Sequence, residues 1–164
     1  MINKKMLDAL NKQINAEMYS SYLYLAMAAD FADKNFPGFA QWMQVQAREE
    51  DAHAMKIFCF IQERGGRVTL KAIDAPPAKW TSPLKAFQDA YAHEQKVTGM
   101  IHDLVMLARA EKDLASEIFL QWFVNEQVEE EASADEIVKR LEMIKDAPQG
   151  LVMLDAKLGA RGAS

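Results

Sequence analysis

Apolar side chains recur every three or four residues along four long stretches of the chain, which is the spacing of one face of an α-helix. We predict long helices over residues 4–33, 38–65, 83–112 and 114–145, and a short fifth helix over 149–158. Residues 66–82 break this pattern, and Pro76-Pro77 within them favours extended chain. We therefore expect one all-α domain over 1–164.

The length of the 66–82 segment predicts the topology. Neighbouring antiparallel helices need only a few connecting residues, whereas this segment could reach roughly 50 Å when extended. It can therefore cross the full length of the bundle. We predict a four-helix bundle running up-down-down-up, with one long crossover and the short C-terminal helix added at the end.

Each predicted long helix breaks its own apolar stripe once, with a polar group near its middle. The breaks repeat between the two halves of the chain at one constant offset, 17 to 94, 49 to 126, 50 to 127 and 53 to 130. Pairs three residues apart share one helix face. The polar residues in these stripes are Glu17, Gln46, Glu50, His53, Glu94, Gln127 and Glu130.

Four carboxylates facing one another inside a bundle would cost several kcal/mol per charge unless they were protonated or paired with cations. No Lys or Arg lies in the same stripes, and two divalent cations would balance the four charges. Oxygen-rich ligation with one imidazole suits Fe(II) or Mn(II) better than zinc. The pattern predicts a dinuclear metal site, although solvent-facing side chains are the alternative for any single one of these residues.

Composition narrows the classes of protein that fit. The net charge of −5, without a cluster of basic residues, argues against nucleic acid and anionic membranes as main partners. A single cysteine, Cys59, excludes an internal disulfide and Cys-based metal sites. The polar N-terminal residues do not resemble a signal peptide, and no apolar run is long enough to span a bilayer. We expect a cytoplasmic protein.

Over its whole length the chain resembles the prokaryotic non-haem ferritins. Four segments carry the resemblance: 15–24, 49–54, 91–94 and 120–131. The ferritin-like form of the four-helix bundle often has two Glu-x-x-His motifs, whereas this chain has Gln127 and Glu130 in place of the second. That asymmetry is similar to the non-haem members, and Asp51 stands where haem-binding relatives place an axial methionine, so no haem is expected.

The resemblance implies an asymmetric pair of iron positions. Glu17, Glu50 and His53 would form the first, and Glu50, Glu94 and Glu130 the second, with Glu50 bridging. Gln127 would hold a water molecule or dioxygen beside them.

The resemblance also implies a third iron position, formed with Glu130 and leading towards a central cavity. Its other members would be Glu49, Glu126 and Glu129, which lie about 100° round their helices from the core positions. A solvated acidic face is the alternative for these three residues.

Tyr24 lies two helical turns after Glu17 on the same stripe. From there it could donate a hydrogen bond to a metal ligand or supply an electron. Packing in the core is the alternative role.

The function implied is that of a ferroxidase and iron-storage subunit. Fe(II) would be oxidised by dioxygen or peroxide, and Fe(III) would be deposited inside a hollow homo-oligomer of twenty-four subunits. Two other classes fit less well: a peroxide-reducing di-iron enzyme of the rubrerythrin type, and a cage subunit without oxidase activity.

Overall fold

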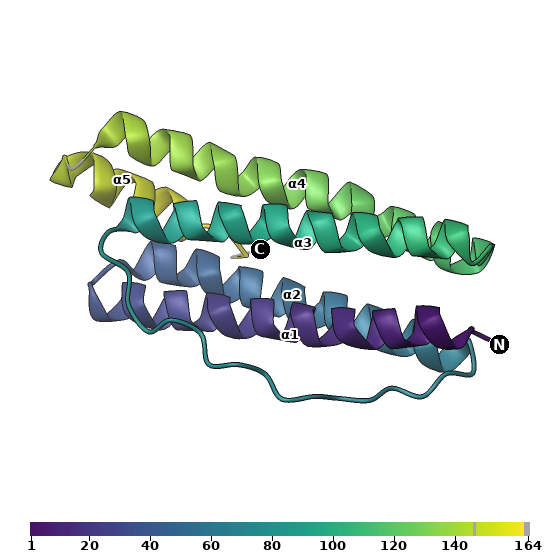
Figure 1. Ribbon diagram of the computed structural model, residues 1–164. Helices are drawn as coiled ribbons and strands as arrows, with labels where there is room; N and C mark the ends of the chain where they lie inside the picture. The colour runs from purple at the N-terminus through teal and green to yellow at the C-terminus, as the bar shows by residue number, and fades with distance from the viewer. Residues whose placement is uncertain (146, 163–164) are drawn as a thin grey trace.

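The computed structural model describes residues 1–145 and 147–162, and its regular elements are all helical. They are α1 (Lys4–Asp33), α2 (Pro37–Glu63), α3 (Pro83–Ala110), α4 (Leu114–Ile144) and α5 (Pro148–Leu158). The pairs α1/α2 and α3/α4 are antiparallel hairpins, and α3 runs in the same direction as α2 (Figure 1). The predicted all-α bundle with up-down-down-up topology is confirmed.

The helix ends differ from the predicted ends by at most two residues, for local reasons. Helix α1 begins at an N-cap, Asn3, whose side chain accepts a hydrogen bond from the backbone of Met6 at 2.9 Å. Helix α2 ends at Glu63 because Gly65 adopts φ +69°, a left-handed conformation that closes the helix. Helix α4 ends at Ile144 because Lys145 adopts φ 54°.

The connector between α2 and α3 runs the length of the bundle beside α1 (Figure 1). It is held there by side chains of α1. Asn11 accepts a hydrogen bond from the backbone of Thr69 at 2.8 Å, and Asn15 donates to the carbonyl of Ala72 at 3.1 Å. Farther along, Asp30 accepts from the backbone of Trp80 at 3.2 Å. These bonds satisfy backbone groups of a segment without secondary structure of its own.

The apolar core is divided into two clusters, one towards each end of the bundle. One cluster includes Phe31, Phe39 and Phe87, where the first hairpin turns and α3 begins. The other includes Leu10, Ile57 and residues of α3 and α4 near the opposite end. The buried polar residues at the helix midpoints belong to neither cluster, so they form a polar layer in the core.

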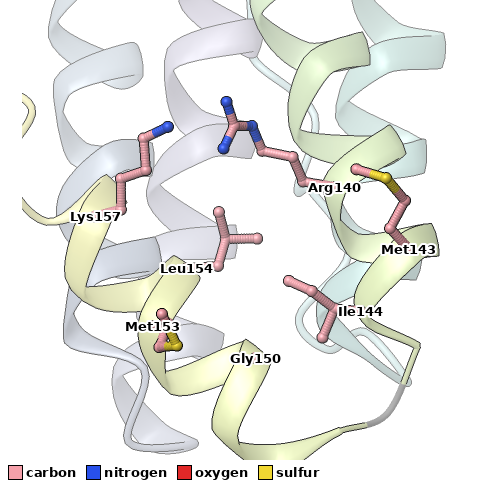
Figure 2. A pocket seen from close by; sticks show the side chains of 7 residues that line it. All are labelled: Arg140, Met143, Ile144, Gly150, Met153, Leu154 and Lys157. Carbon is pink, nitrogen blue, oxygen red and sulfur yellow. The ribbon is translucent and has the colours of Figure 1, made fainter.

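Helix α5 folds back from the end of α4 and leaves an apolar pocket of about 400 Å³ between the two helices. Figure 2 shows Leu154 and Ile144 facing each other across it, with the cationic ends of Arg140 and Lys157 turned towards the same opening. Gly150 permits this packing, because a Cβ there would lie 2.6 Å from Cγ2 of Ile144. The residues lining the pocket include no carboxylate, so it is not a candidate cation site.

None of the described helices combines the length and the apolar composition that crossing a bilayer requires.

Candidate metal centre

The polar layer is built from residues close to the midpoints of the four long helices. Because antiparallel and parallel helices of similar length share one mid-level, these residues meet in the bundle interior. Their exposed fractions are small: Glu17 1%, Glu50 1%, Glu94 2%, His53 4% and Glu130 6%. Acidic side chains are almost never buried to this extent unless they are paired.

The side chains form three overlapping groups, and within each group one potential ligand atom from each residue lies within 4.8 Å of the others. The first group joins α1 and α2, the second joins α2, α3 and α4, and the third joins α2 and α4. Their members are Glu17, Glu50 and His53; Glu50, Glu94 and Glu130; and His53, Glu126 and Glu130. The first two groups consist of the same residues as the two iron positions that the family resemblance implies.

Burial raises the pKa of every buried glutamate in the layer, and repulsion between the carboxylates of the layer adds to this for three of them. For Glu17 and Glu50 the pKa lies well above the usual value, first because of desolvation and next because of a neighbouring carboxylate. The same causes raise the pKa of Glu130 to about 7, where Glu94 is the main repelling charge. Desolvation also raises the pKa of Glu94. Without a cation, therefore, the folded protein favours protonated carboxyl groups here.

One ligand oxygen in the layer lacks a partner. Gln13 donates to Oε1 of Glu17 at 2.8 Å, which fixes that side chain from the preceding turn of α1. Oε2 of Glu17 is buried and has no hydrogen-bond partner among the residues the structure describes. A buried hydrogen-bond acceptor without a partner lowers the free energy of unfolding. A cation bound between Glu17, Glu50 and His53 would satisfy it, so the residues present fit a metal ion.

Glu94 is held from two sides. The hydroxyl of Tyr24, only 1% exposed, donates to its Oε1. The side-chain amide of Gln127 donates to Oε2 of Glu94 at 3.2 Å and lies 3.3 Å from Oγ1 of Thr98. Tyr24 and Gln127 are therefore positioned to orient a ligand, as partners of metal-binding carboxylates commonly are.

Gln46 supports the other side of the layer. The sequence analysis identified it as a polar break in the apolar stripe but did not include it among the site residues. It is 1% exposed, and its amide donates to Oε1 of Glu50 at 3.1 Å and to Oε2 of Glu130 at 2.6 Å. Gln46 and Gln13 each precede a predicted ligand by four residues on the same helix face. That spacing was the signal that could have found both.

The three residues predicted for a third position lie in different surroundings. Oε1 of Glu126 is 3.8 Å from Nε2 of His53, and Glu126 shares a ligand group with Glu130. Glu49 forms an ion pair with Arg161 at 2.5 Å. Glu129 is exposed, and it belongs to none of the three groups found among the described residues. The third position therefore stays a prediction.

A four-helix bundle whose helices each direct a glutamate into the core, with a Glu-x-x-His pair on one of them, has the layout of the carboxylate-rich di-metal proteins. Charge balance and ligand type favour Fe(II) or Mn(II) in such a site.

Comparison with known proteins agrees with this class. A family model described as ferritin-like domain matches residues 7–144. The chain is 44% identical over 161 residues to a bacterial non-heme ferritin of Bacteroides fragilis, covering 98% of this chain and 100% of that protein. It is 38% identical over 161 residues to one of Staphylococcus aureus, covering 98% and 97%. The chain belongs to the ferritin family.

Solved structures agree as well. An open pore ferritin from the hyperthermophilic archaeon Archaeoglobus fulgidus superposes with a TM-score of 0.97 at 54% identity, covering 98% of this chain and 99% of that chain. An engineered closed form of the same ferritin also gives 0.97 at 54%, covering 98% of each. These matches extend over the whole bundle and α5.

Proposed function

We propose that this protein is an iron-storage ferritin subunit that oxidises Fe(II) at a dinuclear centre within its own bundle. The observation that carries the proposal is the pair of ligand groups that share Glu50 inside the core. Family membership supports storage as the purpose. Glu17, Glu50 and His53 would hold one Fe(II), and Glu50, Glu94 and Glu130 the other.

In the proposed reaction, one molecule of oxidant accepts the electrons of two Fe(II) ions. Each Fe(II) gives up one electron, and dioxygen takes two electrons and two protons to leave as hydrogen peroxide. If peroxide is the oxidant instead, it takes two electrons and two protons and leaves as two waters. Anionic oxygen ligands favour the harder, more highly charged Fe(III), so the carboxylates assist oxidation.

We propose that oxidised iron leaves through a third position on the side of Glu126 and Glu130. The group of His53, Glu126 and Glu130 supports this, because it shares two residues with the first two groups and so continues them. Glu49 and Glu129 would join it on the side nearer solvent. The path from the pair of iron positions to a cavity would then consist of carboxylates and the imidazole of His53.

Storage requires an enclosed space, and we propose a homo-oligomeric shell of twenty-four subunits. The surface of the single subunit supports assembly, because a pocket of about 230 Å³ formed by α1, α2 and the connector is lined largely by apolar groups. Tyr22, Leu25 and Ile73 there are 51%, 47% and 39% exposed. A second subunit would bury them, as interfaces bury apolar patches.

Iron loading tests the proposed function. Apoprotein titrated with Fe(II) under argon and then exposed to oxygen should retain many more irons per subunit than the two or three that the ligand groups can hold. Iron is counted after gel filtration, and electron microscopy of the same fraction should show hollow particles. Retention of only a few irons per subunit would indicate an isolated oxidase and would refute storage.

Tyr24→Phe is expected to slow aerobic Fe(II) oxidation by about 10-fold to 100-fold, the usual cost of losing a partner that orients a metal ligand. The ring is kept, so packing is preserved, while Glu94 loses the hydroxyl that donates to it. Stopped-flow absorbance of the ferric product measures the rate. Tyr22→Phe, on an exposed tyrosine of the same helix, is the matched control and should leave the rate unchanged. Equal rates in both variants would assign Tyr24 to packing alone.

A further inference from the structure

The C-terminal helix α5 is anchored on the first turns of α2. Phe36, the N-cap residue of α2, makes no side-chain capping bond, and Asp155 of α5 supplies one by accepting a hydrogen bond from the backbone of Phe39 at 2.8 Å. The two helices approach so closely that a Cβ on Gly38 would lie 1.7 Å from the carbonyl oxygen of Asp155. Helix α5 is thus held rigidly against α2, and this contact directs the residues that follow it along α2.

Those residues bring Arg161 to the rim of the polar layer. Its guanidinium lies 4.5 Å from the centre of the Trp42 ring, a cation–π contact. One nitrogen, Nη2, donates to Oε2 of Glu49 at 2.5 Å, and the other, Nη1, donates to Oε1 of Gln46 at 2.9 Å. The planar fork of an arginine can hold two acceptors in this way.

The hydrogen bond from Arg161 fixes the orientation of the Gln46 side-chain amide in the layer. The oxygen of the Gln46 amide faces Arg161, and its nitrogen therefore faces the two carboxylates, Glu50 and Glu130. If the amide were flipped, its NH2 group would face the guanidinium, which is also a donor, and its oxygen would face both carboxylates, which are also acceptors. Arg161 thus fixes the orientation in which Gln46 supports two of the predicted iron ligands.

The bond to Glu49 works against metal binding at the rim. A carboxylate paired with an arginine has to exchange that partner before it can ligate a cation. We propose that Arg161 is a positioning residue that holds Glu49 and thereby keeps the third metal position closed until a metal ion displaces the guanidinium. The conformation of residues 159–161 would then depend on whether the third metal position is occupied. This inference rests on the proposed metal centre.

Anaerobic titration with Mn(II) tests the proposal without any oxidation step, with free Mn(II) counted by electron paramagnetic resonance. The wild type should bind two ions per subunit tightly and a third weakly. In Arg161→Gln the third ion should bind about tenfold more tightly, within the usual range of coupling between sites. Arg161→Lys keeps the charge but cannot hold both acceptors, so its third ion should bind with intermediate affinity.

Arg48→Gln is the matched control for lost charge. Arg48 is an exposed residue of α2 next to Glu49, and removing it changes the net charge by the same amount. If the third ion binds equally tightly in Arg48→Gln and Arg161→Gln, charge alone explains the effect and the proposed role of Arg161 is wrong. If all variants and the wild type bind it alike, the proposal also fails. A wild type that binds no Mn(II) would instead refute the metal centre itself.

Amide hydrogen exchange gives a second readout that a purely structural role would not produce. The amides of Gly159, Ala160 and Arg161 donate to carbonyls within the end of α5. Displacement of the guanidinium by the third ion should speed their exchange in the wild type. In Arg161→Gln exchange should be fast already and insensitive to Mn(II). Exchange in the wild type that does not respond to the third ion would overturn the displacement.

Discussion

Glu50→Ala is expected to lower the initial rate of aerobic Fe(II) oxidation by more than about 100-fold, beyond the cost usually seen for a residue that only supports a ligand. Glu50 belongs to both proposed iron positions, so its loss removes a ligand from each and the bridge between them. His53→Ala should also abolish rapid oxidation, since it removes the only imidazole of the first position. Stopped-flow absorbance of the ferric product measures both rates.

The control distinguishes lost ligation from lost structure. Asp51→Ala removes a carboxylate from the same helix at an exposed position and should oxidise iron at the wild-type rate. Glu50→Gln keeps the side-chain shape, and without metal at neutral pH it should melt no lower than the wild type, because it removes a carboxylate whose charge raises the pKa of Glu17. A wild-type oxidation rate in Glu50→Ala would exclude this pair of positions as the catalytic centre.

The fold and the buried carboxylates could be predicted because they follow from periodicity. The position of a residue along its helix can be found from the sequence of that helix alone. A glutamate within an apolar stripe must face the bundle interior, as the rest of the stripe does. Glu17, Glu50 and Glu94 were identified in this way, and each is almost fully buried. The connector length then determined which helices are parallel, because a segment of nineteen residues, 64–82, between α2 and α3 fits an extended crossover.

The surroundings of the rim residues could not be predicted in the same way. An angle round one helix does not say what lies opposite it. Glu49 and Glu126 have equivalent places in the two halves of the chain, yet one contacts Arg161 and the other approaches His53. The difference comes from the C-terminal segment, which packs on α2 and has no counterpart in the repeat. Arg161 lies far from Glu49 along the chain, and no spacing pattern links them.

Bound metal is expected to stabilise the protein most at neutral pH, where the metal-free form is weakened. The pKa of Glu130 is raised from 4.5 to about 7 in the folded state, and those of Glu17 and Glu50 are raised well above 4.5. Between about pH 4.5 and 7 the folded chain therefore binds more protons than the unfolded chain. Over this range the contribution of these groups to the free energy of unfolding of the apoprotein falls as the pH rises.

Divalent metal should reverse that trend, because its ligands bind it in the deprotonated form. At a free concentration of Mn(II) 100 times Kd, stabilisation of about 2.7 kcal/mol is expected. For a chain of this size that corresponds to a rise in Tm of roughly 5–10 °C. Differential scanning calorimetry under argon should show this rise at pH 7.5 and a much smaller one at pH 5, where protons compete for the carboxylates. The Glu17→Gln, Glu50→Gln double variant should lose most of the rise at pH 7.5. Identical melting with and without Mn(II) at pH 7.5 would mean that the facing carboxylates are tolerated by protonation alone, and it would remove the basis for a cation between them.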